Sequence, residues 1–126
     1  MKKIILSENA PAPIGPYSQA VEVNGFLYCS GQVPLDAKSG EVVGENIGEQ
    51  TEKVMQNISE VLKAADLTFD NIIKTTIFIT DMASFQELNA VYAKYFKNEP
   101  PARSTVAVRG LPKNVLVEIE VLACRG

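Results

Sequence analysis

The sequence predicts a single α+β domain in which one mixed sheet carries two helices on one of its faces. The chain has 126 residues, and one domain usually takes about 100 to 200 residues. Apolar residues recur at helical spacing in two segments and at alternate positions in several others. The order of these segments is strands, helix, strand, helix and strands, which indicates an α+β fold over residues 1–126.

The N-terminal part predicts a loop followed by a hairpin. Residues 4–6 are a short apolar run and predict a strand, whereas residues 7–16 contain three prolines and predict an irregular loop. Asn24-Gly25 then separates two runs that predict strands at about 17–23 and 26–31. Asn-Gly favours a type I′ turn, because that turn needs a positive φ at both central residues.

The first helix is predicted from residue 47 onward, after a longer connection over residues 32–46 with a turn near 36–40. Asn46 is typical of a helix N-cap, and Glu49 stands where its capping-box partner is expected. The apolar residues are spaced mostly by threes and fours, which places them on one stripe of a helix. They are Ile47, Val54, Ile58, Val61, Leu62 and Ala65.

A β-branched strand and a second amphipathic helix follow. Over residues 72–79, alternation places Ile73, Thr75, Ile77 and Ile79 on one face, and Ile72, Lys74, Thr76 and Phe78 on the other. Ser84 and Glu87 form a capping-box pattern, and Asn98 with Pro100-Pro101 ends the helix. Its apolar positions are Phe85, Leu88, Val91, Tyr92, Tyr95 and Phe96.

Two final strands are predicted at about 102–109 and 115–124, with a turn region at 110–114. The strands hold more apolar side chains than two helices on one face can cover. We therefore expect the other face of the sheet to be buried by self-association.

Composition excludes several classes of function. The chain has no histidine and only two cysteines, Cys29 and Cys124, so it lacks the commonest general base and metal ligand, and no metal site is expected. With 12 basic and 15 acidic residues the net charge is −3, which disfavours nucleic acid as a partner. No apolar stretch suggests a signal peptide or a membrane span, so a cytoplasmic location is expected.

Charged residues in the last two strands predict either a structural ion pair or a functional site. Alternation places Glu118 and Glu120 on one face of the last strand, beside two leucines. Arg103 and Arg109 share a face of the preceding strand. If the two strands pair as a hairpin, an arginine and a glutamate lie near each other. Buried charges are costly unless they are paired, so both interpretations stay open.

An arginine and a glutamate together suit one kind of chemistry. The planar guanidinium holds a small carboxylate through two hydrogen bonds. A nearby glutamate can position or deprotonate a water molecule as a general base. The pair therefore suggests a small carboxylate substrate and a hydrolytic step.

Weaker candidates each have a structural interpretation beside the functional one. Tyr17 is a core aromatic or a ligand contact, and Ser30-Gly31 is an ordinary turn or an oxygen-binding element. Asn89 is a solvated or capping amide beside the apolar stripe of the second helix. Lys113 solubilises its turn or serves an anion, and the two cysteines are most simply small buried residues.

Several motifs together resemble those of the RidA family of imine deaminases, also called the YjgF family. The resemblance covers essentially the whole chain in register. The C-terminal elements are Pro101-Ala102-Arg103-Ser104-Thr105-Val106, Leu111-Pro112-Lys113 and Val117-Glu118-Ile119-Glu120-Val121. The earlier ones are Asn9-Ala10-Pro11, Ile14-Gly15-Pro16-Tyr17-Ser18-Gln19, Ser30-Gly31-Gln32 and Lys74-Thr75-Thr76-Ile77-Phe78. Two departures are Thr105, where several members have cysteine, and Asp66, where many have glycine.

The resemblance implies a chorismate-mutase-like (ferredoxin-like) fold assembled as a homotrimer with clefts between subunits. It implies hydrolysis of 2-imino acids, such as 2-iminobutanoate and 2-iminopropanoate, to 2-oxo acids and ammonia without a cofactor. By the resemblance, Arg103 grips the substrate carboxylate and Glu118 orients the attacking water. The cleft residues that it implies are Tyr17, Ser30, Gly31 and Asn89.

Alternation alone does not rank Glu118 above Glu120 as the residue that positions the water; only the resemblance does. Other functions also stay open. The chain can be a non-catalytic module that binds a small carboxylate and reports to a partner protein. An endoribonuclease or translation inhibitor is a third interpretation, which the acidic net charge and the absence of histidine disfavour.

Overall fold

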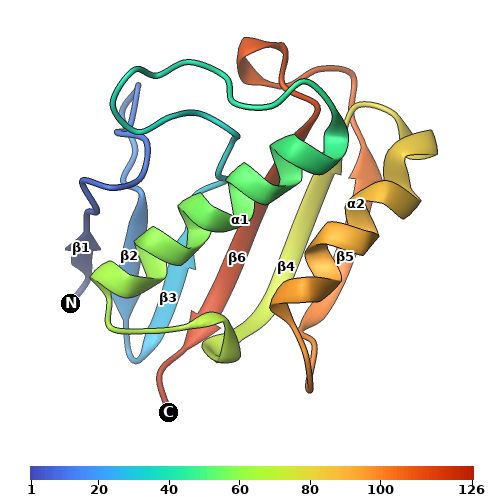
Figure 1. Cartoon of the computed structure of the whole chain (residues 1–126). Coiled ribbons are helices and arrows are strands. Elements are labelled where there is room, and N and C mark those ends of the chain that lie inside the picture. The colour runs from blue at the N-terminus through green and yellow to red at the C-terminus, as the bar shows by residue number, and fades with distance from the viewer.

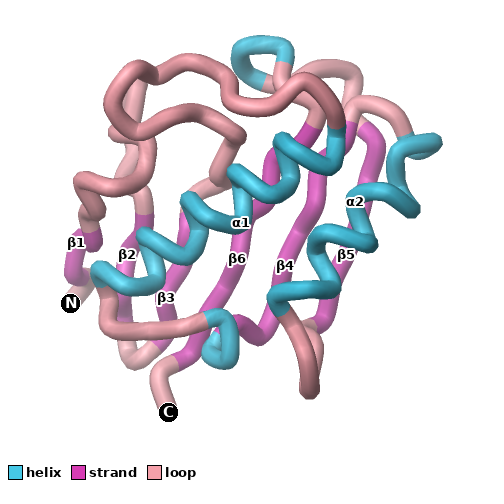
Figure 2. The backbone as a smooth tube through the Cα atoms, viewed as in Figure 1, coloured by secondary structure: helices cyan, strands magenta, loops and turns pink.

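The computed structural model describes residues 1–126 and confirms the α+β architecture. One six-stranded sheet has the strand order β1-β2-β3-β6-β4-β5, and both helices lie across the same face of it (Figure 1). The longest loops lie at the end of the sheet where β6 begins, and shorter connections lie at the other end (Figure 2). The elements are β1 (Lys3–Ile5), β2 (Ala20–Val23), β3 (Phe26–Cys29), α1 (Ile47–Ala64), β4 (Ile72–Ile79), α2 (Phe85–Tyr92), β5 (Ala102–Ala107) and β6 (Val117–Cys124).

The β2–β3 hairpin has the predicted turn but shorter strands. Asn24 has a φ of 52° and Gly25 a φ of 83°, as a type I′ turn requires. β2 begins at Ala20 and β3 ends at Cys29, so Tyr17 and Ser30 lie in loops. Just beyond these strands, Ser30 N donates to Gln19 O at 2.9 Å and the Ser30 hydroxyl donates to Ser18 O at 2.6 Å.

The last two strands do not pair with each other as a hairpin. β6 lies between β3 and β4 and runs antiparallel to both, whereas β5 is at the sheet edge and runs parallel to β4. Parallel strands need a crossover connection, and α2 supplies it. The other edge of β4 is then left for β6, so β5 and β6 never pair.

The α1 stripe forms the centre of the core. All six apolar positions predicted for it are buried. Asn46 Oδ1 accepts a hydrogen bond from Glu49 N at 2.9 Å, which confirms the N-cap. The reciprocal bond differs from the prediction, because Glu49 Oε1 accepts from Glu45 N instead of Asn46 N.

A bulge in β4 changes the predicted faces of that strand. Ile72 pairs with Ala123 and Lys74 with Leu122, so Ile73 is the extra residue between them. Ile72 is therefore buried on the helix-covered face with Thr75, Ile77 and Ile79. Ile73 is 44% exposed, and its predicted place on that face is wrong.

The start of α2 also differs from the prediction. Ser84 makes no side-chain capping bond, so the capping box of Ser84 and Glu87 is wrong. Asp81 Oδ1 accepts from Ala83 N at 3.0 Å and caps a 3₁₀ turn over Met82–Ser84 instead. α2 follows this turn directly, and the backbone N–H of its first residue, Phe85, donates to Met82 O within the turn.

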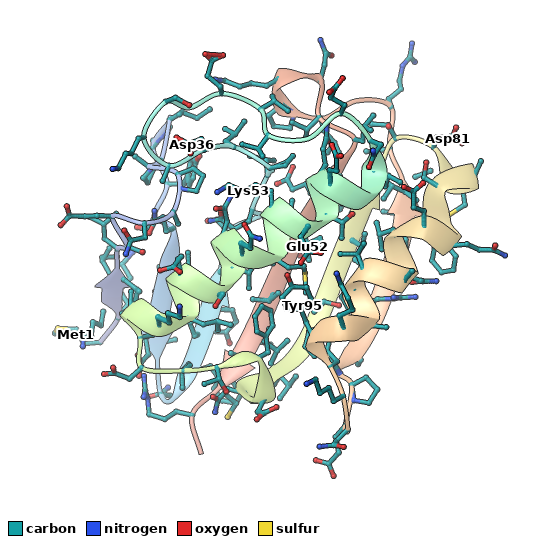
Figure 3. The ribbon with its side chains drawn as sticks, viewed as in Figure 1. Met1, Asp36, Glu52, Lys53, Asp81 and Tyr95 are labelled. Atoms are coloured by element: carbon teal, nitrogen blue, oxygen red, sulfur yellow. The ribbon has the colours of Figure 1, made fainter.

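The two helices are joined by side chains as well as by packing. Glu52 on α1 faces Tyr95 just beyond α2 (Figure 3) and accepts hydrogen bonds from Tyr95 Oη and from Lys94 Nζ, the latter at 2.6 Å. These bonds hold the pKa of the Glu52 carboxyl below its usual value. They fix the C-terminal end of α2 against α1.

The face of the sheet away from the helices carries exposed apolar side chains. Tyr28 is 51% exposed and Val106 is 43% exposed, and neither is covered by another element of the chain. No helix is both long and apolar enough to cross a membrane. The open face is the one that the sequence predicts to be buried by self-association.

Candidate functional site

A cavity of about 310 Å³ lies at the loop end of the sheet, beside the start of β6. Its walls come from the Pro-rich loop, the segment after β3 and the turn before β6. Four of the predicted site residues line it, namely Tyr17, Ser30, Gly31 and Glu118. The other lining residues are Pro11, Ala12, Ile14, Gln19, Gln32, Val33, Leu35, Pro112 and Lys113.

The Glu118 side chain lies directly over the backbone of Gly31. The segment after β3 is bound to β6, because Gln32 N donates to Ile119 O at 2.8 Å and Ile119 N donates to Gln32 O at 3.1 Å. A Cβ atom added at Gly31 would lie only 2.0 Å from Glu118 Oε2. Glycine at position 31 is thus what leaves room for the carboxyl of Glu118.

The structure distinguishes the two glutamates that alternation could not rank. Glu118 is half-buried in the cavity, and its burial, followed by the nearby charge of Glu120, raises the pKa of its carboxyl. Glu120 is exposed and borders a separate hollow of about 280 Å³ with Lys74 and Tyr28. Glu118 therefore combines a place in the cavity with a pKa moved towards the range of a general base.

Tyr17 and Ser30 are held by local hydrogen bonds at the cavity wall. Tyr17 Oη accepts from Ile14 N at 3.2 Å, and the side chain remains 49% exposed. This is not the core position that the structural interpretation of Tyr17 required. The Ser30 hydroxyl donates its hydrogen bond to Ser18 O. It can therefore only accept a hydrogen bond from a ligand.

Arg103 is held in place by α2. Its guanidinium carbon lies 5.3 Å from the ring centre of Phe85 and 5.0 Å from that of Tyr92, within cation–π range. Its NH1 donates to Asn89 Oδ1 at 2.8 Å. Asn89 is therefore neither a capping nor a purely solvated amide. Thr75 Oγ1 and Tyr92 Oη, 2.8 Å apart, share a hydrogen bond that fixes the Tyr92 ring.

The Arg103 side chain has no acidic partner. The three salt bridges of the chain join other residues, and the groups around the guanidinium are an amide and two rings. Guanidinium donors remain for an anion, and the fork geometry suits a carboxylate. Phe85 and Tyr92 were predicted only as part of an apolar stripe, and nothing in their spacing marks them as contacts of an arginine.

Arg103 and Glu118 lie on opposite faces of the sheet. Arg103 pairs with Thr75, which is buried on the helix-covered face, whereas Glu118 pairs with Phe78 on the open face. The proximity of an arginine and a glutamate, which depended on a hairpin of the last two strands, therefore does not occur within one chain. The candidate residues form two groups: Arg103 with Asn89, and Glu118 with Tyr17, Ser30 and Gly31.

The remaining candidates are Lys113 and the two cysteines. Lys113 lines the cavity, and its Nζ donates to Gly40 O at 2.7 Å, so it links two loops across the cavity wall. Cys29 is only partly buried and packs against the core, and desolvation raises the pKa of its thiol to about 12. Cys124 is partly buried and unpaired.

Together, these observations define a small α+β protein with a cavity beside Glu118 on the open face of its sheet and an arginine without an acidic partner on the helix-covered face. The family model described as Endoribonuclease L-PSP matches residues 7–125. The chain belongs to this family, which is the RidA family predicted from the motifs.

Individual relatives match over nearly their whole length. A putative regulator AldR of Lactococcus lactis is 57% identical over 96% of each chain. A 2-iminobutanoate/2-iminopropanoate deaminase of Mus musculus is 44% identical over 100% of this chain and 93% of its own. The crystal structure of a Rid-family protein from Yersinia pestis, YyfA, is 51% identical, has a TM-score of 0.96, and covers 98% of this chain and 99% of its own.

Proposed function

We propose that this protein hydrolyses 2-imino acids, such as 2-iminobutanoate and 2-iminopropanoate, to 2-oxo acids and ammonia. The observation that carries the proposal is the Glu118 carboxyl, half-buried in a cavity of small-molecule size with its pKa raised. The relative from mouse that is named as a deaminase of these two imino acids supports the same activity.

The reaction needs one water molecule and one group that accepts and returns a proton. A protonated imine is already electrophilic, so the oxygen of water attacks its carbon while Glu118 takes a proton from that water. Glu118 then gives this proton to the nitrogen of the resulting carbinolamine. The C–N bond breaks and ammonia leaves. Glu118 takes the hydroxyl proton as the carbonyl of the 2-oxo acid forms, and then passes it to the departing ammonia.

In this proposal Arg103 binds the substrate carboxylate through its guanidinium fork. Because Arg103 and Glu118 lie on opposite faces of one sheet, the complete site takes Arg103 from one copy of the chain and Glu118 from another. The exposed apolar side chains on the open face, such as Tyr28 and Val106, support the same assembly. We propose the homotrimer with three clefts between subunits.

The name of the Lactococcus relative favours a second candidate, a regulatory module that binds a small carboxylate without turnover. Such a module needs Arg103 but has no use for a proton acceptor at Glu118. Turnover separates the two candidates.

In the direct test, a threonine dehydratase generates 2-iminobutanoate in situ, and its decay is followed with and without this protein. We expect faster decay with the wild-type chain and none of the acceleration with Arg103→Ala. An unaccelerated decay with correctly assembled wild-type protein would exclude the deaminase and leave the carboxylate-binding module.

A mixing experiment tests the shared site. Arg103→Ala and Glu118→Gln are each expected to be inactive. Mixed oligomers, formed by unfolding and refolding the two variants together, contain clefts with both intact residues, so activity should return. If the mixture stays as inactive as each variant alone, Arg103 and Glu118 do not meet across an interface.

A further inference from the structure

The Pro-rich loop forms a wall of the cavity with almost no secondary structure of its own. It contributes Pro11, Ala12, Ile14 and Tyr17 to the lining. Within residues 7–17 a single backbone–backbone hydrogen bond forms, from Tyr17 N to Gly15 O. A segment of this length cannot hold a wall in place by its own backbone.

One buried side chain supplies the missing bonds. Gln19 is only 2% exposed. Its Oε1 accepts from Ser7 N at 2.7 Å, and its Nε2 donates to Ser7 O at 3.1 Å and to Pro11 O at 2.9 Å. The same Nε2 lies 3.4 Å from Ala10 O. The carboxamide therefore gathers both ends of a five-residue stretch of the loop around itself.

The backbone of Gln19 ties this wall to the floor of the cavity. Gln19 O accepts from Ser30 N at 2.9 Å, and Ser30 directly precedes Gly31, over which the Glu118 carboxyl lies. One residue thus connects the loop that carries Tyr17 to the segment that positions Glu118.

We propose that Gln19 is a positioning residue, whose carboxamide holds the Pro-rich wall at the distance from Glu118 that the substrate requires. The substrate named here rests on the proposed function. Gln19→Glu is the sharpest perturbation, because it keeps the shape of the side chain. It removes the two N–H donors and directs a carboxylate at the carbonyls of Ser7 and Pro11.

A matched control exists elsewhere in the chain. Gln50 is also buried and also spans two segments: its Nε2 donates to Gly44 O at 3.2 Å and its Oε1 accepts from Leu116 N at 2.8 Å. Neither Gln50 nor Gly44 lines the cavity. Gln50→Glu therefore makes the same chemical change, at similar burial, away from the wall.

We expect Gln19→Glu to raise the KM for 2-iminobutanoate by about tenfold, or about 1.4 kcal/mol of binding free energy. Its kcat should stay within about twofold, since the wall binds ground state and transition state alike. Gln50→Glu should lower the melting temperature comparably and leave KM within about twofold. Equal rises of KM in both variants, or an unchanged KM in Gln19→Glu, would overturn the proposal.

Two further measurements need no turnover. The Kd for the product 2-oxobutanoate should rise by the same factor in Gln19→Glu; an equal Kd in wild type and variant, or no binding to the wild type, overturns the proposal. If the wild type binds 2-oxobutanoate but does not hydrolyse the imine, the proposed function fails and the role of Gln19 does not.

Hydrogen exchange of the wild type covers the case in which Gln19→Glu does not fold. The Ser7 amide should exchange far more slowly than the amides of Glu8 and Ala12, since among these only Ser7 N donates to Gln19. A Ser7 amide that exchanges as fast as its neighbours would show that the carboxamide does not hold the loop.

Discussion

Gly31→Ala separates the geometry of the site from the stability of the fold. The added Cβ would lie 2.0 Å from Glu118 Oε2, 2.8 Å from its Cδ and 3.0 Å from its Cγ, whereas ordinary contact begins at 3.4 Å. The Glu118 carboxyl must therefore move by roughly 1.4 Å or swing away. The φ of Gly31 is not in the left-handed region, so alanine itself causes no backbone strain.

We expect Gly31→Ala to lower catalytic activity much more than the stability of the fold. A catalytic group displaced by about 1 Å can lose about a hundredfold in rate, so we expect kcat for 2-iminobutanoate to fall by about that factor. Unfolding free energy should change by less than about 1 kcal/mol, since a flexible side chain gives way and alanine restricts the unfolded chain. The assays are imine decay under saturating substrate and urea denaturation of the same preparation.

Two controls decide how the effect arises. Gly110→Ala adds the same methyl group where nothing lies within 4 Å and should leave kcat unchanged. In a Glu118→Gln background, Gly31→Ala should cost almost nothing more, because both changes act on the same carboxyl. Wild-type kcat in Gly31→Ala, or full additivity with Glu118→Gln, would refute the assignment of Glu118.

Three further predictions concern the arginine, the pH profile and a helix end. Arg103→Lys keeps the charge but loses the fork and the ring contacts, so kcat/KM should fall by about tenfold or more; wild-type rates would count against the carboxylate grip. Glu118 must be ionised to accept a proton, so activity should fall with decreasing pH around a pKa that lies above 4.5, the ordinary value for a glutamate. Glu120→Gln should move that fall in activity to lower pH without abolishing it, and an unmoved pH profile would contradict the coupling. Asp66 holds a φ of 59° at the end of α1, so Asp66→Gly should raise the melting temperature by about 2–4 °C, as calorimetry would show.

The regular elements were predictable because local patterns determine them. The α1 stripe needs only its spacing and Asn46, and the turn at Asn24-Gly25 needs only two residues that tolerate positive φ. Alternation in β6 likewise separates the buried Val117, Ile119 and Val121 from the glutamates. None of these inferences requires knowledge of a distant contact.

The wrong predictions concern features that depend on contacts between residues far apart in the sequence. Nothing local in β5 or β6 reveals that β4 lies between them, because α2 makes the crossover. The bulge at Ile73 depends on register with β6, and Asp81 replaces Ser84 as a cap because a 3₁₀ turn precedes α2.

The same limit applies to the candidate site. Its four cavity residues were all predicted in strands, whereas Tyr17, Ser30 and Gly31 lie in loops. Their convergence depends on side-chain bonds such as that of Ser30 to Ser18. The clamp of Phe85 and Tyr92 on Arg103 had no signal at all, because an apolar stripe serves a core equally well. Motif resemblance named residues that physical periodicity could not rank, Glu118 above all.

The separation of Arg103 and Glu118 has a consequence for the proposed activity. A single chain holds the carboxylate grip on the helix-covered face and the proton acceptor on the open face, so neither group alone places both ends of an imino acid. The proposed assembly would then complete the site as well as cover apolar side chains. Each chain positions its two groups by different means: α2 holds Arg103, and the absence of a side chain at Gly31 leaves room for the Glu118 carboxyl. Since groups that are already positioned lose little freedom when they meet a substrate, the proposed interface would bring water and carboxylate together without any large motion.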